Sequence, residues 1–224
     1  MQITVDREPA AYTTSFRYTD RETKAEYVAR KYASILKGSV LDVGCDNRRL
    51  RGFLDPAVRY LGVDLNPDAD LVLNLDRDNL PLADRSFEVV VCTDVLEHLE
   101  RCHAVFDELC RVAAARVLVS LPNPARNFVT SLADGSAGHI KYYGLPVDPP
   151  ADRHRWFFTR DQAESFLTIR GRRAGFTVEQ MDAEDDATRP PKCPKWPDKS
   201  ESADLLDIHG LHGGTLWCLL QRKE

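Results

Sequence analysis

The sequence lacks several features that mark common classes of protein. Its six cysteines include no CxxC pair, so we expect reduced thiols rather than disulfides or a zinc knuckle. No apolar run is as long as a membrane span, and residues 1–10 do not show the charged-then-apolar plan of a signal peptide. These absences predict a cytoplasmic protein with no membrane partner.

An excess of positive charge is also missing. The chain has 30 Lys and Arg residues against 35 Asp and Glu residues, and its formal net charge is −5. Proteins that bind nucleic acid usually present a basic surface. The short basic clusters at residues 48–51 and 170–173 are typical of solvated helix faces. The composition therefore predicts no nucleic-acid partner.

The glycine-rich fingerprint of dinucleotide-binding proteins is incomplete. In VLDVGCDNRRL (residues 40–50), an apolar run ends at Asp42 and is followed by a turn at Gly44. The GxGxxG pattern would place two further glycines at Asp46 and Arg49. An aspartate directed at a pyrophosphate would repel it, so the turn does not favour a dinucleotide.

A nucleoside that carries an amino acid tail fits this turn better. Asp64 ends the next apolar run and is placed to accept hydrogen bonds from ribose hydroxyls. The ammonium group of the tail would meet Asp42 or backbone carbonyls. Its carboxylate would meet N–H groups at the start of a helix expected after Gly44.

Apolar segments alternate with helical patterns along the chain, which indicates βαβ units and a parallel sheet. Thr19 with Glu22 and Thr159 with Gln162 are capping boxes, which predict helices that end before Gly38 and Gly175. Two long irregular insertions, 123–158 and 183–214, interrupt the alternation. The predicted strands are residues 40–42, 60–63, 71–75, 87–92, 117–121, 176–181 and 215–220.

Several motifs together resemble the class I S-adenosylmethionine-dependent methyltransferases of the small-molecule branch. They are VLDVGCDN, YLGVDLN, LPLADRSFEVVVCTDVLEHL, and FDELCRV with VLVSLPN, and they span residues 38–123. HRWFFT to AGF (residues 154–176) resembles the segment before the sixth strand. The resemblance implies an α/β Rossmann-like three-layer sandwich, with a seven-stranded, mostly parallel sheet and an antiparallel last strand. It also implies one methyltransferase domain over residues 1–224, in which 1–37 form an N-terminal arm and helix.

The resemblance implies S-adenosylmethionine as the cofactor and a small-molecule acceptor that is methylated on oxygen or nitrogen. The two insertions would line the acceptor side. Eleven residues would bind the cofactor: Asp42, Gly44, Cys45 and Asp46 at the methionine moiety, Asp64 at the ribose, Leu65, Asn74, Leu75 and Asp76 at the adenine, and Thr93 and Asp94 beneath the sulfonium.

Histidines in the first insertion are the candidate general bases, because an imidazole has a pKa suited to proton transfer near neutral pH. His154 and His139 are the first candidates, and each can also be read as a packing or surface residue. His209 and His212, in DIHGLHGG, are the alternatives.

Two questions stay open at this level. Asp94, Glu97 and His98 resemble the metal-supporting site of ubiquinone-pathway O-methyltransferases, but LEH occurs across the family without metal, so no metal ligand is assigned. The glycine-poor first motif leaves a second function open, a catalytically degenerate binding or scaffold protein. The sequence leaves the oligomeric state open, with a homodimer as one alternative.

Overall fold

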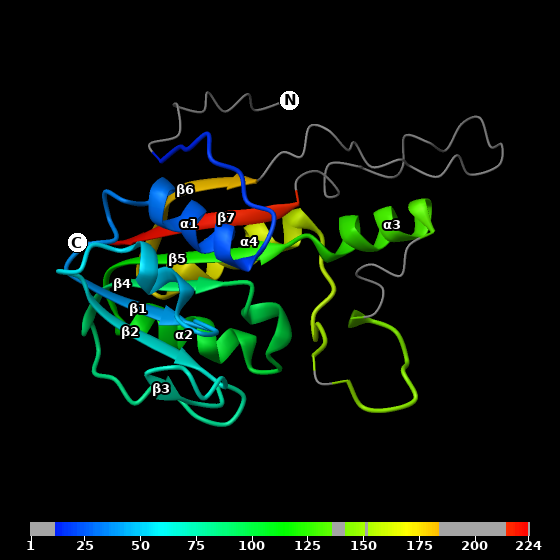
Figure 1. Cartoon of the computed structure of the whole chain (residues 1–224), viewed down its shortest axis with the longest axis horizontal. Coiled ribbons are helices and arrows are strands. Elements are labelled where there is room, and N and C mark those ends of the chain that lie inside the picture. Colours follow the sequence, from blue (N-terminus) through cyan, green and yellow to red (C-terminus); the bar gives the residue numbers. More distant parts are fainter. Residues whose placement is uncertain (1–11, 136–141, 151, 184–213, 224) are drawn as a thin grey trace.

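The computed structural model describes residues 12–135, 142–150, 152–183 and 214–223. Its centre is a single seven-stranded sheet (Figure 1). The strands are β1 (Ser39–Val43), β2 (Arg59–Asp64), β3 (Leu71–Val72), β4 (Phe87–Thr93), β5 (Ala113–Pro122), β6 (Phe176–Ala183) and β7 (Thr215–Arg222). Their order in the sheet is β3-β2-β1-β4-β5-β7-β6. The first five strands pair in parallel and β7 is antiparallel to both β5 and β6, which confirms the predicted sheet.

Helices cover both faces of the sheet and make the three layers that were predicted. Residues of α1 (Arg21–Lys31) and of the 3-10 helix η1 (Arg49–Phe53) belong to the core on one face. Residues of α2 (Cys102–Val112) and α4 (Arg160–Arg173) belong to the core on the other. Two elements lie near the ends of β4 and β5: the 3-10 helix η2 (Leu96–His98) and α3 (Pro124–Asp134).

The central strands contribute side chains to both cores because successive residues of a strand point to opposite faces. Val40 belongs to the core beneath α1, whereas Leu41 and Val43 belong to the core beneath α2 and α4. All five residues of β1 are buried, as expected of a central parallel strand. Burial of each large apolar side chain contributes about 1.5 to 3 kcal/mol, so β1 is firmly held at the centre of the molecule.

The start of α1 differs from the prediction by one residue. The helix is capped by Asp20, whose Oδ1 accepts a hydrogen bond from the Thr23 N–H at 2.8 Å, and the Thr23 hydroxyl accepts from the Asp20 N–H at 3.1 Å. The predicted box of Thr19 with Glu22 was wrong because an ionised aspartate is the stronger acceptor. The second predicted box, Thr159 with Gln162, caps α4 and is confirmed.

The segment after Gly44 does not start an α-helix, which corrects the prediction. Asp46 and Arg48 have left-handed backbone angles, with φ of 51° and 63°, and only the short η1 follows. Left-handed residues break the repeating helical geometry. The turn therefore does not present the end of a long helix to a ligand, and the N–H groups of Gly44, Cys45 and Asp46 donate within the protein.

The third strand is shorter than predicted. It ends at Val72, and the Asn74 carbonyl then accepts hydrogen bonds from the N–H groups of Arg77 and Asp78, both at 2.9 Å. The Leu73 N–H still donates to the Asp64 carbonyl of β2 at 2.9 Å, and the turn takes residues 74 and 75 away from the sheet.

The insertion 123–158, predicted to be irregular, contains α3. Asn123 caps this helix by accepting a hydrogen bond from the Arg126 N–H at 3.1 Å, Pro124 occupies its first turn, and Gly135 ends it with φ of 69°. These are ordinary start and stop signals, and they were hidden by the polar composition around them. In Figure 1, α3 projects away from the sheet beyond the end of β5.

Five cysteines lie in the described residues, and all are buried and free, as predicted. Cys193 lies outside those residues. Within the described ranges, no helix has the length and apolar character needed to cross a membrane.

Candidate active site

One cavity lies at the carboxyl ends of β1, β2 and β4, with a volume of about 700 Å³. The chain leaves β1 toward β2 and later returns to β4 on its other side, so this is the point of an open α/β sheet where ligands bind. All eleven residues predicted to bind the cofactor line the cavity, and so does His154. We call the part lined by the eleven residues the donor half. His139, His209 and His212 lie outside the described residues.

Gly44 turns the chain at the end of β1, where no other residue type would fit. Its φ is 81°, and a Cβ built on it would lie 2.0 Å from Cγ2 of Val95. Its N–H donates to the carbonyl of Val63 at 2.7 Å, which ties the turn to β2. Backbone atoms therefore approach the cavity closely at this point.

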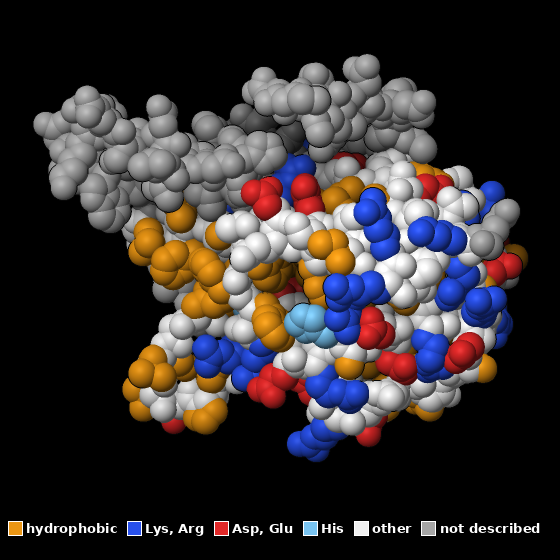
Figure 2. Space-filling model, turned by 180° about the vertical axis from the view of Figure 1, so that it is seen from behind, with side chains coloured by type: hydrophobic (Ala, Val, Ile, Leu, Met, Phe, Trp, Pro, Cys, Tyr) orange, Lys and Arg blue, Asp and Glu red, His pale blue; other side chains and the backbone are white. Residues whose placement is uncertain are grey.

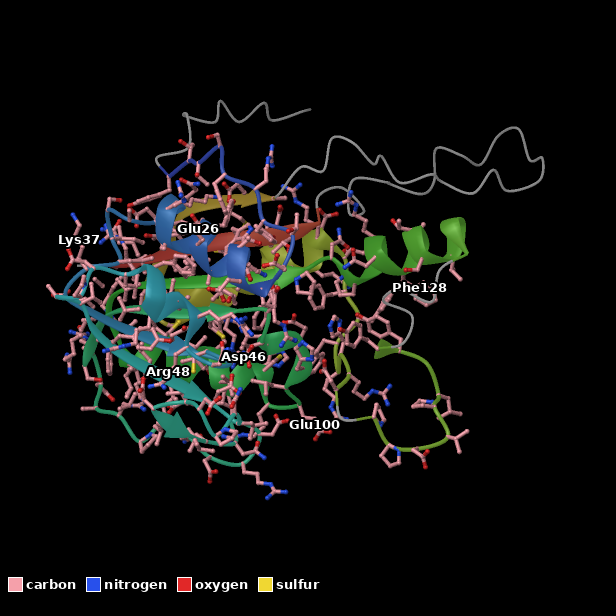
Figure 3. All side chains as sticks on the ribbon, in the orientation of Figure 1. Glu26, Lys37, Asp46, Arg48, Glu100 and Phe128 are labelled. Atoms are coloured by element: carbon pink, nitrogen blue, oxygen red, sulfur yellow. The ribbon has the colours of Figure 1, made fainter. Side chains whose placement is uncertain are left out.

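Asp46 occupies the position of the second glycine in the GxGxxG pattern, and a local hydrogen-bond network explains why an aspartate stands there. The Asp46 N–H donates to Oδ2 of Asp64 at 2.8 Å, and the Asn66 side chain donates to Oδ1 of Asp46 at 3.0 Å. Burial opposes ionisation of Asp46, but hydrogen bonds from Asn66 and Arg49 outweigh it and lower its pKa. Figure 3 shows Asp46 among side chains at this end of the sheet.

Asp64 is fixed by the same network. The Asn66 N–H donates to its Oδ1 at 2.9 Å while Oδ2 accepts from the turn. Each carboxylate oxygen has a second lone pair, so Asp64 can still accept hydrogen bonds from the hydroxyls of a ribose.

Asp42 is a buried acid, and no Lys or Arg of the described chain forms an ion pair with it. Its Oδ2 accepts a hydrogen bond from the Tyr60 hydroxyl at 2.7 Å. Burial raises its pKa to about 6, although the Tyr60 hydrogen bond acts in the opposite direction. Such a carboxylate suits a cationic ligand, because an ammonium group would supply the missing charge.

Lys24 was not among the predicted site residues, yet it forms an ion pair with Asp94 inside the cavity. Ser120 also donates to Oδ1 of Asp94 at 2.7 Å. Burial of Asp94 opposes ionisation, but the charge of Lys24 outweighs it and lowers the pKa of Asp94. Four residues of α1 face the cavity at helical spacing, namely Arg21, Lys24, Ala25 and Val28. That spacing was the available signal in the sequence.

The other part of the cavity, which we call the acceptor half, is formed by η2 and by residues 142–150 and 152–155. The Arg155 N–H donates to the Glu97 carbonyl at 2.7 Å, and the Trp156 ring N–H donates to the Leu99 carbonyl at 2.7 Å. The Tyr142 ring stacks on His154, with 4.5 Å between ring centroids and 9° between planes. These contacts hold His154 against η2.

Glu97, His98 and His154 meet in the acceptor half. One potential ligand atom from each lies within 4.8 Å of the others. Glu97 is 2% exposed, its Oε2 has no hydrogen-bond partner among the described residues, and burial raises its pKa. The sequence pointed to Asp94, Glu97 and His98 as neighbours, but in the structure the carboxylate of Asp94 is occupied by Lys24 and Ser120.

The sheet order, the glycine turn and the acid at the end of β2 define a nucleoside-binding α/β protein of the Rossmann-like type. Residues 16–181 match the family model described as a methyltransferase domain, and the chain belongs to this family. It is therefore an enzyme that uses S-adenosylmethionine as methyl donor. A comparison with curated protein sequences gives no match.

Solved structures of other methyltransferases share the fold. Magnesium protoporphyrin IX methyltransferase from Synechocystis PCC 6803, with bound SAH, is 15% identical with a TM-score of 0.55, over 90% of this chain and 83% of that one. An S-adenosylmethionine-dependent methyltransferase from Archaeoglobus fulgidus is 17% identical with a TM-score of 0.56, over 91% and 95%. The small RNA methyltransferase HEN1 is 16% identical with a TM-score of 0.57, over 99% of this chain but 27% of that one.

Proposed function

We propose that this methyltransferase transfers the methyl group of S-adenosylmethionine to the oxygen or nitrogen of a small-molecule acceptor. The observation that supports this proposal is the cavity itself, which collects the eleven predicted cofactor residues on one side and His154 on the other. The acceptor would enter the acceptor half. Its nucleophilic atom would then face the sulfonium methyl group of a donor held in the donor half.

The donor half carries charges that suit this cofactor. In our assignment, Asp42 meets the ammonium group, Asp64 the ribose hydroxyls, and residues 74–76 the adenine. Asp94 lies nearest the sulfonium, where a negative side chain favours the cationic sulfur. Lys24 pairs with Asp94 and offsets most of this attraction, so loss of the positive charge on sulfur during methyl transfer meets little electrostatic opposition.

The chemical step is an in-line displacement. A bond forms between the acceptor atom and the methyl carbon while the carbon–sulfur bond breaks. Its electron pair stays on sulfur, and the products are the methylated acceptor and S-adenosylhomocysteine, with one proton released from the acceptor. Holding nucleophile and methyl carbon in line supplies most of the acceleration.

Apolar surface on α3, the loop that follows it and the segment before α4 favours a small acceptor with aromatic or aliphatic parts. Leu132, Leu145 and Phe157 are 57%, 99% and 55% exposed, and Figure 2 shows hydrophobic side chains gathered over α3 and the adjoining loop. The rest of that face mixes charges of both signs, unlike a surface built for phosphates. One similar structure is named for methylation of small RNA, so RNA belongs in the acceptor screen.

Titration calorimetry with S-adenosylhomocysteine tests the donor half. The unaltered chain should bind, and Asp64→Ala should weaken binding by at least about tenfold, because loss of a charge-assisted hydrogen bond costs about 1.5 to 3 kcal/mol. Asp68→Ala makes the same change at an exposed position four residues away and should bind normally. Absence of binding by the unaltered chain would overturn the proposal.

A second measurement concerns the acceptor. Consumption of S-adenosylmethionine would be followed by mass spectrometry with pools of hydroxylated and amine-bearing small molecules, and in parallel with short single-stranded RNA. Turnover with a small-molecule pool is expected. Turnover with RNA alone would contradict the choice of acceptor and leave the cofactor assignment intact.

A further inference from the structure

Glu97 presents a buried carboxylate oxygen for which the described protein supplies no partner. Glu97 is 2% exposed, and its Oε2 accepts no hydrogen bond from any described group. A buried carboxylate in this state is costly unless a cation or a proton joins it. Lys24, a cation that lines the same cavity, is engaged by Asp94 instead.

Two imidazoles lie beside this carboxylate. Nε2 of His98 is 3.7 Å from Oε1 of Glu97, and His154 completes a group whose potential ligand atoms all lie within 4.8 Å of one another. Two ligands bound about 2.1 Å from one ion are no more than about 4.2 Å apart. The ligand atoms of the three side chains exceed this limit by at most about 0.6 Å, so small side-chain rotations would bring them to a single ion.

We propose that Glu97, His98 and His154 form a binding site for one divalent transition-metal ion in the acceptor half of the cavity. One carboxylate and two imidazoles suit Mn²⁺, Fe²⁺, Co²⁺ or Zn²⁺. Ca²⁺ and Mg²⁺ prefer oxygen ligands, and the site offers one oxygen-bearing residue to two nitrogen-bearing ones. The carboxylate of Asp94 is not a ligand, because Lys24 and Ser120 occupy it.

An oxygen atom lies close to Nδ1 of each histidine. The Tyr143 hydroxyl lies 2.7 Å from Nδ1 of His154, and Oδ1 of Asp152 lies 2.7 Å from Nδ1 of His98. Metal-binding histidines commonly donate one ring N–H to an oxygen and coordinate through the other nitrogen. A proton on Nδ1 of His154, facing the Tyr143 oxygen, places the lone pair that an ion requires on Nε2. Asp152 lies at ion-pair distance from Nδ1 of His98, but the two are not aligned as a hydrogen bond.

The ion would also define the acceptor chemistry, a consequence that rests on the proposed function. Three protein ligands leave coordination positions for an oxygen of the acceptor. A bound cation lowers the pKa of a coordinated hydroxyl, so the site favours transfer to oxygen over transfer to nitrogen. His154 would then serve as a ligand and would not be the general base predicted from the sequence.

Metal binding can be measured without the methyl donor. The full chain would be freed of metal with a chelator, exchanged into chelator-free buffer, and titrated with CoCl₂. The d–d absorption bands report coordination, and calorimetry with MnCl₂ gives affinity and stoichiometry. We expect one ion per chain. Glu97→Gln, His98→Gln and His154→Gln should each reduce affinity by at least about 100-fold, and Tyr143→Phe by about tenfold.

Matched substitutions separate this site from other metal-binding groups. His103→Gln removes an exposed imidazole on α2, and Glu26→Gln removes a carboxylate on α1 that does not line the cavity (Figure 3). The pair His209→Gln and His212→Gln removes the other histidine cluster of the sequence. All of these variants should bind metal like the unaltered chain. Circular dichroism would confirm that each compared variant is folded.

The results separate the metal site from the methyl-transfer proposal. No metal binding by the folded, unaltered chain overturns the site, and so does binding that survives all three ligand substitutions. Binding lost only in the His209 and His212 variant also overturns it. Failure of the function would appear separately, as a chain that binds the metal but does not bind S-adenosylhomocysteine.

Discussion

The two halves of the cavity are built in different ways. The donor half is made by turns that leave β1, β2 and β4. Two of its acids, Asp46 and Asp64, are held by each other and by Asn66, all within one stretch of residues 46–66. The acceptor half depends on contacts between segments far apart in sequence, such as the Arg155 N–H on the Glu97 carbonyl. We infer that the sheet fixes the arrangement of the donor-half residues, and that the acceptor half can change without disturbing the donor half.

The largest effect is expected at the turn that the donor half shares with the sheet. Gly44→Ala puts a Cβ against Val95 and forces alanine to adopt φ of 81°. Strain and overpacking together should lower the free energy of unfolding by about 2 to 5 kcal/mol and abolish measurable binding of S-adenosylhomocysteine. Urea unfolding and calorimetry measure the two quantities.

The control for this change is Gly52→Ala. A Cβ at Gly52 meets no atom within 4 Å, so stability should stay within about 1 kcal/mol and binding should be normal. If Gly44→Ala had the same stability and binding as Gly52→Ala, the turn could adapt to a larger residue, and the sheet would not hold the donor half rigidly.

The buried acid of the donor half should make stability depend on pH. The pKa of Asp42 is raised from 3.8 to about 6 in the folded chain, so as pH rises the unfolded chain loses this proton first. The stability contributed by protonated Asp42 is therefore fully present below about pH 4 and is lost as pH rises through 6. A shift of this size corresponds to about 3 kcal/mol.

Asp42→Asn removes this titration and keeps an acceptor for the Tyr60 hydroxyl. Relative to the unaltered chain, the variant should gain up to about 3 kcal/mol of unfolding free energy between pH 4 and pH 7. Urea titrations across this range, with Asp68→Asn as an exposed control, measure the difference. If the unfolding free energies of Asp42→Asn and the unaltered chain changed equally with pH, burial would not raise the pKa of Asp42 as proposed.

The ion pair of Lys24 with Asp94 joins α1 to the sheet beside both halves. Lys24→Met leaves Asp94 without a cation, and removal of one partner of a fully buried pair costs about 3 to 5 kcal/mol. The Asp94 side chain is 38% exposed, so water screens part of this loss and we expect about 1 to 2 kcal/mol. As a control, Lys37→Met at an exposed position should change the free energy of unfolding by less than about 0.5 kcal/mol. Equal changes in the two variants, measured by urea unfolding, would show that the Lys24–Asp94 pair contributes nothing to stability.

Local patterns in the sequence predicted the donor half because the relevant residues follow directly after apolar strands. Asp42, Gly44 and Asp64 could be placed at one edge of the sheet without knowledge of any distant contact. Lys24 could not, because which face of α1 meets the cavity depends on how the helix packs on the sheet. The convergence of His154 with Glu97 and His98 is likewise a product of tertiary structure, since 55 residues separate His98 from His154.

The smallest effect is expected in the acceptor half, at the hydrogen bond from the Trp156 ring to the Leu99 carbonyl. Trp156 is 38% exposed, so Trp156→Phe loses one hydrogen bond that water can replace and should cost no more than about 1 kcal/mol. Hydrogen exchange should accelerate in peptides that cover residues 152–158 and stay unchanged in those that cover residues 42–48. Affinity for S-adenosylhomocysteine should stay within about twofold, because a change below about 0.4 kcal/mol is expected at the donor half. Faster exchange in both regions would show that the halves are coupled, and it would remove the distinction between a donor site fixed by the sheet and an acceptor site that varies independently.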